Sequence, residues 1–226
     1  MERAQLIVEQ LTEHLHEPVN CLTHLFGAVF SLFGMLVLLE LSQGEPLYIV
    51  SFAIYGLSSV LLYMASALFH GLKVSPEQRR LLLRLDHAGI FSLIAGSYTP
   101  VALLALTQYD PRAGWAFFGG IWAVALLGMF FKLKYLDAPR WISTGFYLLL
   151  GWASLLIVAP ISQTVPLGGL VLMLLGGLFY SVGAVIFVRQ RPNLYPGVLE
   201  HHELWHLLVL AGGACHFLML LFYITP

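Results

Sequence analysis

Charged residues are scarce in this chain of 226 residues: Asp, Glu, Lys and Arg make up 10% of it, whereas hydrophobic residues make up 59%. A soluble domain carries about 25% charged and roughly 45–50% apolar residues. So few charges cannot cover a surface that faces water, although they suffice for one that faces lipid. The formal net charge of -1 gives no sign of a nucleic acid partner. The composition therefore predicts a single membrane domain over residues 1–226.

Cysteine is also rare, with only Cys21 and Cys215, and each lies inside an apolar run. This excludes a disulfide framework and a cysteine-rich metal site. A secretory signal peptide is not expected, because residues 2–17 lack a continuous apolar stretch and a cleavage site. These residues instead mix charges with Leu, Ile and Val at helical spacing. They predict a short amphipathic helix lying on the membrane surface.

Seven apolar runs are long enough to cross a bilayer as helices, which takes about 20 residues each. The runs cover residues 20–41, 47–72, 83–107, 113–132, 141–160, 165–188 and 202–224. Proline and glycine mark the connections between them. The predicted fold class is therefore an all-α membrane protein with seven transmembrane helices.

Lys and Arg are distributed very unevenly between the two ends of these runs. If the chain crosses seven times, Arg112 alone falls on one side. The other side holds Arg3, Lys73, Arg79, Arg80, Arg84, Lys132, Lys134, Arg140, Arg189 and Arg191. Because cytoplasmic loops carry the positive excess, the N-terminus is predicted to be cytoplasmic and the C-terminus to lie outside.

Polar residues gather at the cytoplasmic ends of the predicted spans, and ionisable groups within spans suggest function. Ser66 and His70 close the second run, Asp86 opens the third, and His202 and His206 open the seventh. The alternating direction of the spans brings these ends to the same leaflet. The topology therefore predicts one polar site there.

The spacing of the histidines indicates a metal. His202 and His206 are four residues apart, so they share a helix face and can bind one zinc ion. His70 could be the third ligand, and three protein ligands with a water form the open, catalytic arrangement. Asp86 could orient or deprotonate that water, and Ser66 could hold it.

Several of these residues have structural alternatives. Asp86 could pair with Arg84 at the start of its helix, and Ser66 could be a small packing residue. His216 lies about 15 Å along the helix from His206, too far to share its metal. The sequence leaves both a structural and a functional role open for Glu17, Asn20, His24, His87, Glu203 and His216.

The segment HELWH, residues 202–206, also matches the H-E-x-x-H pattern of metalloproteases, in which Glu203 would be the general base. That interpretation leaves Ser66 and His70 without a role. It also places the motif on the last span, where little chain remains to shape a peptide groove. A protease is therefore the weaker hypothesis.

Four segments together carry a more specific resemblance. They are EPVNCLTH (17–24), SALFH (66–70), LDHAGIFSLIAGSYTP (85–100) and HELWHLLVLAGGACHF (202–217). In order and in position within the spans, they resemble the hemolysin III branch of the progestin and adipoQ receptor family, as a bacterial member. The resemblance implies a seven-helix fold oriented opposite to G-protein-coupled receptors. It also implies a zinc ion held by His70, His202 and His206, with Asp86 and Ser66 near its water.

The expected function follows from the site and from the resemblance, since eukaryotic members resemble ceramide-cleaving hydrolases. We expect a zinc-dependent hydrolase of a lipid amide or ester in the bacterial inner membrane, or a sensor derived from one, in membrane-lipid homeostasis. A non-enzymatic receptor with structural zinc and a pore-forming hemolysin-like protein are the alternatives. A membrane lipid is the expected substrate or ligand, and no protein partner can be named from the sequence.

Overall fold

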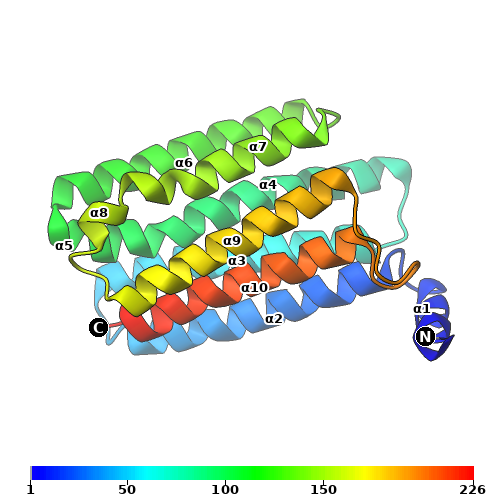
Figure 1. Cartoon of the computed structure of the whole chain (residues 1–226), viewed down its shortest axis with the longest axis horizontal. Helices are drawn as coiled ribbons and strands as arrows, with labels where there is room; N and C mark the ends of the chain where they lie inside the picture. Colours follow the sequence, from blue (N-terminus) through cyan, green and yellow to red (C-terminus); the bar gives the residue numbers. More distant parts are fainter. Residues whose placement is uncertain (1) are drawn as a thin grey trace.

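The computed structural model describes residues 2–226, and the regular secondary structure in this range consists of helices. Within it no β-strand forms, and an isolated bridge between Tyr195 and Leu199 is the one β contact. The long helices run side by side along one axis, and the two termini lie at opposite ends of the bundle (Figure 1).

Six helices in the described range are long and apolar enough to cross a membrane. They are α2 (Pro18–Leu41), α3 (Pro46–Gly71), α4 with its continuation (Pro76–Tyr109), α6 (Pro111–Lys134), α9 (Leu167–Arg189) and α10 (His201–Tyr223). The first four begin with proline, which is favoured there because the first helical N–H has no partner within the helix. Six of the predicted runs therefore correspond to helices.

The third of these helices is longer than its apolar run. α4 (Pro76–Pro100) begins seven residues before the predicted start, because Ser75 and Gln78 form a reciprocal capping box at its N-terminus. Its other end contains Pro100, which cannot donate a backbone hydrogen bond. The helix widens there into a buried π-helical segment, η1 (Val101–Leu106), and ends in α5 (Thr107–Tyr109).

The predicted span 141–160 is not a single straight helix. It consists of α7 (Arg140–Gly151), the 3₁₀ segment η2 (Trp152–Leu156) and α8 (Val158–Ile161). Pro160 disfavours a continuous helix, because its ring would clash with the carbonyl four residues earlier. Tyr98 compensates for the break: its hydroxyl donates to the Gly151 carbonyl and accepts from the Ser154 N–H at 2.8 Å.

The break in the helix between α7 and α8 affects the number of transmembrane helices that can be counted. A count of seven regular transmembrane helices is not confirmed, because residues 140–161 contain no helix of spanning length. The broken segment nevertheless runs beside α6 along the length of the bundle (Figure 1).

The N-terminal helix α1 (Glu2–Thr12) is shorter than the predicted 2–17 and lies across one end of the bundle (Figure 1). The chain after it turns back onto the end of α3, where the Glu17 N–H donates to the His70 carbonyl at 2.8 Å. This contact places the Glu17 side chain beside His70.

The helices pack closely inside the bundle, and the outer surface of the bundle is apolar. α3 lies between α2 and α4, and α10 contacts both α2 and α9. At Gly89 of α4, an added Cβ would lie 2.9 Å from the Cα of Leu62, so the α3 and α4 backbones almost touch. The outer surface exposes large apolar side chains such as Phe26 (64%), Leu127 (69%) and Leu149 (75%). Such a surface suits lipid and not water.

Candidate metal centre

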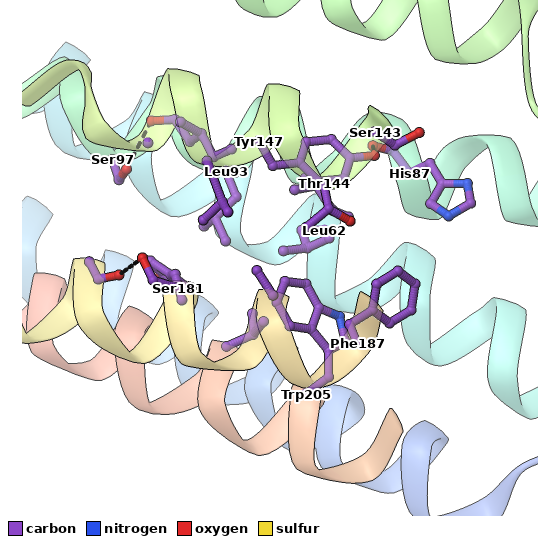
Figure 2. Close-up of a pocket in the computed structure, with 18 of the residues that line it drawn as sticks. Leu62, His87, Leu93, Ser97, Ser143, Thr144, Tyr147, Ser181, Phe187 and Trp205 are labelled. Atoms are coloured by element: carbon purple, nitrogen blue, oxygen red, sulfur yellow. Dashed lines mark hydrogen bonds between the residues drawn. The ribbon is translucent and has the colours of Figure 1, made fainter. Parts of the chain in front are cut away.

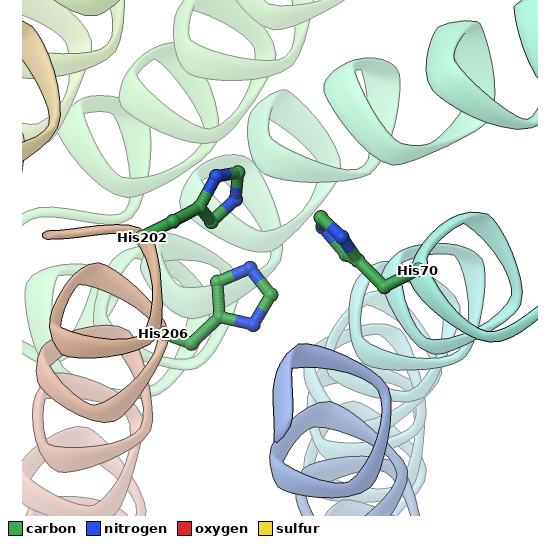
Figure 3. Close-up of side chains that lie close together, drawn as sticks. All are labelled: His70, His202 and His206. Atoms are coloured by element: carbon green, nitrogen blue, oxygen red, sulfur yellow. The ribbon is translucent and has the colours of Figure 1, made fainter. Parts of the chain in front are cut away.

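Three histidines meet at one end of the bundle. The spacing predicts the pair His202 and His206, and the topology predicts that His70 lies at the same end. Their ring centroids are 4.9 Å apart in all three pairings of His70, His202 and His206. Their possible ligand atoms all lie within 4.8 Å of one another. One imidazole extends from α3 and two from α10, and they point toward one another (Figure 3).

The orientation of His70 is set by Glu17. The Nδ1 atom of His70 lies 2.5 Å from Oε2 of Glu17, while its Nε2 is buried without a hydrogen-bond partner among the described residues. Because an ionised carboxylate can only accept, a neutral His70 in this contact carries its proton on Nδ1 and has its lone pair on Nε2. This is the tautomer that a metal requires, fixed by the type of outer carboxylate common in zinc sites.

Glu17 is itself held in a charged environment. Its Oε1 lies 3.4 Å from Nη2 of Arg79 and 3.3 Å from Nδ1 of His16. Burial by itself would raise the pKa of Glu17, but the hydrogen bond and the attraction to His70 outweigh it and lower the pKa to about 2. The carboxylate is therefore ionised at neutral pH.

Asn20 connects Glu17 to the start of α10. Its Nδ2 donates to Oε1 of Glu203 at 2.7 Å and to Oε2 of Glu17 at 3.3 Å. The second oxygen of Glu203 accepts from the Glu200 N–H at 2.9 Å, which caps α10. Both oxygens of Glu203 are thus engaged at the helix terminus, and Glu203 is not part of the histidine group. This geometry disfavours Glu203 as a general base.

Ser66 and Asp86 line the same cavity as the three histidines. Ser66 lies one helical turn before His70, and its Oγ is buried without a partner. Asp86 is partly buried and is not in the tight group of ligand atoms. Among the ion pairs of residues 2–226, none joins Asp86 to Arg84. Both side chains are placed beside the histidines without belonging to the ligand group.

His24 lies closer to the site than the sequence could establish. Its ring stacks on His206 with centroids 3.6 Å apart and planes inclined by 7°, and its edge faces Tyr63. Within residues 2–226, neither of its ring nitrogens has a hydrogen-bond partner. His216 lies elsewhere in the cavity, edge-on to Tyr180, and is outside the histidine group, as predicted.

A cavity of about 890 Å³ extends from the histidines between α3, α4, α7, α9 and α10. Small-molecule sites have volumes of roughly 300–1,000 Å³, so this cavity is near the upper limit. Its wall is mainly apolar, with hydroxyl groups at intervals (Figure 2). The side chains in view include Leu62, Leu93, Ser97, Tyr147, Ser181, Phe187 and Trp205.

The histidine group fits zinc in its donor type and number. Nitrogen ligands in a tetrahedral zinc site lie about 3.4 Å apart, given bond lengths near 2.0–2.1 Å. Small side-chain rotations from the present spacing of up to 4.8 Å would reach that value. The Nε2 of His70 and the Nδ1 of His206 are both buried without partners. A bound metal would satisfy groups that the chain leaves unpaired.

The comparisons with known proteins agree with the sequence resemblance. Residues 12–217 match the family described as Haemolysin-III related. The chain belongs to this family. Hemolysin-3 of Bacillus cereus is 34% identical over 220 residues, covering 96% of each chain. The Hemolysin-3 homolog of Bacillus subtilis (strain 168) is 34% identical over 209 residues, covering 92% of this chain and 93% of the relative. The human monocyte to macrophage differentiation factor is 29% identical over 205 residues, covering 88% and 80%.

Sequence patterns alone do not reveal two features of this haemolysin-III-related chain. The contact between Glu17 and His70 depends on the turn after α1, although EPVN (17–20) is part of a segment that carries the resemblance. Lys132 resembles a loop charge in the sequence, but it lies in the last turn of α6 and is buried. No pattern in the sequence distinguishes it from the exposed Lys134.

Proposed function

We propose that this haemolysin-III-related protein is a zinc-dependent hydrolase that cleaves an amide or ester bond in a membrane lipid. The observation that carries the proposal is the convergence of His70, His202 and His206 on the wall of a large apolar cavity. Zinc bound there would supply a Lewis acid and a source of nucleophilic water. We place the protein in the inner membrane of a bacterium, in membrane-lipid homeostasis.

The roles of the chain's own residues follow from their positions. His70, His202 and His206 would hold the metal, and Glu17 would keep His70 in the required tautomer. The Asp86 carboxylate accepts the proton of the attacking water, and the Ser66 hydroxyl orients that water. The apolar wall of the cavity holds the hydrocarbon part of the lipid and excludes bulk water.

The proposal includes a topology of seven crossings with a cytoplasmic N-terminus. The broken segment from α7 to α8 would be the fifth crossing, its exposed backbone satisfied by Tyr98. Termini at opposite ends of the bundle support an odd number of crossings (Figure 1). The excess of Lys and Arg at the α1 end supports the orientation.

The name of the Bacillus cereus relative, Hemolysin-3, favours a second candidate function, which is membrane lysis. Dye-filled liposomes containing the purified protein separate the two candidates. The hydrolase proposal predicts lipid cleavage without rapid dye release. Dye release without any cleavage would favour the lytic function.

The hydrolase is tested by comparing two carboxylate substitutions in purified, zinc-loaded protein with lipids extracted from a bacterial membrane. Asp86→Asn keeps the size of the side chain but cannot accept a proton, so zinc stays bound and hydrolysis falls about 10²–10⁴-fold. Glu203→Gln serves as the comparison and is expected to keep most of the activity, because Glu203 caps α10. The readout is product release measured by mass spectrometry.

Two outcomes would contradict this account. If Glu203→Gln abolishes cleavage and Asp86→Asn does not, the protease-like assignment of the general base is correct. If the unaltered protein cleaves no lipid from the membrane, the sensor function replaces the hydrolase.

A further inference from the structure

Lys132 is a buried cation without an ionised partner. The side chain is 3% exposed, and its Nζ donates to the Leu136 carbonyl and to Oγ of Ser143, both at 3.0 Å. Among the described residues no carboxylate lies within 4.0 Å of it, and the neighbouring Asp137 pairs with Arg80. A buried ammonium is costly unless an anion compensates its charge.

Polar groups that can donate hydrogen bonds line the cavity with Lys132. Oγ1 of Thr144 and Nδ1 of His87 are buried and have no hydrogen-bond partner among residues 2–226. Thr144 and Ser143 lie in the first turns of α7, and the positive end of a helix favours anions. Figure 2 shows His87 and Ser143 at the same end of the pocket.

All of these side chains line the cavity that contains the histidines, and Arg140 lines it as well. These side chains come from α4, α6 and α7, three helices that line the same cavity. An ammonium, two hydroxyls and an imidazole together suit a ligand with several acceptor oxygens and negative charge. A phosphate group has both properties, and lysine is a common phosphate ligand.

We infer that Lys132, Ser143, Thr144 and His87 form a phosphate-binding subsite of the cavity, which recognises the headgroup of a phosphorylated lipid. The connected apolar cavity favours a lipid over a free ion, because it would take the hydrocarbon chains of the same molecule. As a statement about substrate class, the inference rests on the proposed hydrolase. As a statement about binding, it is independent of catalysis.

The test measures binding to the purified full-length protein in detergent by native mass spectrometry. The probes are dioleoyl phosphatidic acid, dioleoylglycerol, which lacks the phosphate, and inorganic phosphate. The variants are Lys132→Met and Thr144→Val. The matched control is Lys134→Met. Lys134 lies two residues after Lys132, its side chain is exposed, and it does not line the cavity. Thermal unfolding of each variant checks that it folds.

Phosphatidic acid is expected to bind at least about 10-fold more tightly than dioleoylglycerol, a free energy difference of about 1.4 kcal/mol. Lys132→Met should remove this preference, Thr144→Val should reduce it, and Lys134→Met should leave it unchanged. If Lys132→Met does not fold, the inference is tested with Thr144→Val, which should reduce the preference for phosphatidic acid. The inference is wrong if the two lipids bind equally, or if Lys134→Met has the same effect as Lys132→Met.

Two further experiments are needed. The first distinguishes a lipid headgroup from free phosphate, and the second distinguishes failure of the subsite from failure of the proposed hydrolase. If inorganic phosphate binds in a Lys132-dependent manner and neither lipid binds, the residues form a phosphate site but the assignment to a lipid headgroup is wrong. Repeating the lipid titration in His202→Ala, His206→Ala protein separates binding from catalysis. Retained preference there, with no hydrolysis by the unaltered protein, would support the subsite and reject the hydrolase.

Discussion

At the scale of single residues, Glu17 connects α2, α3 and α10 beside the candidate metal site. Its carboxylate binds His70 at the end of α3, it lies directly before α2, and Asn20 extends its contacts to Glu203 on α10. The geometry of the three histidines therefore depends on a side chain that would not itself contact the metal. Such outer contacts commonly change metal affinity 10–100-fold.

Glu17→Gln tests this role. Gln keeps the length of the side chain but loses the charge that favours the Nδ1-protonated tautomer of His70. The dissociation constant for zinc should rise about 10–100-fold, as measured by competition with a chelator. Glu13→Gln changes an exposed glutamate in the same connection and should leave the zinc affinity unaltered. Equal zinc affinities for Glu17→Gln and the unaltered protein would contradict the role.

How far the sequence predicts the site depends on how each residue is positioned. His202 and His206 follow from spacing alone, because four residues return a helix to the same face. His70 follows from topology, because the ends of α3 and α10 lie at the same end of the bundle. Contacts of Glu17, His24 and Lys132 depend on turns and tilts that a single sequence does not specify. The roles of Ser66 and Asp86 stay predictions, although both line the cavity.

At the scale of helices, apolar runs predict where regular spans begin and end, because hydrocarbon requires a fully bonded backbone. They do not predict how irregular turns are stabilised. Pro100 and Pro160 lie inside predicted runs, and the chain responds with a π-helical segment at the first and a break before the second. The Tyr98 hydroxyl that supports the break comes from a different helix, so only the tertiary structure shows it.

The close approach of α3 and α4 beside the site gives a prediction at this scale. Gly89→Ala would place a methyl group 2.9 Å from the Leu62 Cα, and backbone cannot move aside cheaply. Overpacking of this type costs typically 1–3 kcal/mol, so the melting temperature should fall. Gly119→Ala is the matched control, since an added Cβ there meets nothing within 4 Å. An unchanged melting temperature for Gly89→Ala would show that the two helices can separate.

At the scale of the whole molecule, the bundle has the candidate metal site at one end and a mainly apolar cavity extending from it. Composition predicts the membrane class, because so few charges cannot cover a soluble surface. The cavity itself could not be predicted, because it depends on how α4 and α7 are spaced from α9 and α10. The haemolysin-III family assignment applies to nearly the whole chain, with residues 12–217 matched.

The proposed topology predicts that the two termini lie on opposite sides of the membrane. Fusions of a cytoplasm-active fluorescent protein to the N-terminus and of a periplasm-active phosphatase to the C-terminus should both be active. The exchanged fusions should both be inactive, which serves as the control. Cytoplasmic activity at the C-terminus would exclude seven crossings and remove the argument that brings the polar helix ends to one leaflet.

The central claim is that His70, His202 and His206 bind a zinc ion. The most direct measurement is the zinc content of the purified protein, combined with X-ray absorption spectroscopy of the metal's ligands. The account predicts about one zinc per chain with three imidazole ligands and one oxygen ligand, and loss of the metal in a His202→Ala, His206→Ala double variant. Full zinc occupancy in that double variant, or an unaltered protein that binds no zinc, would contradict it.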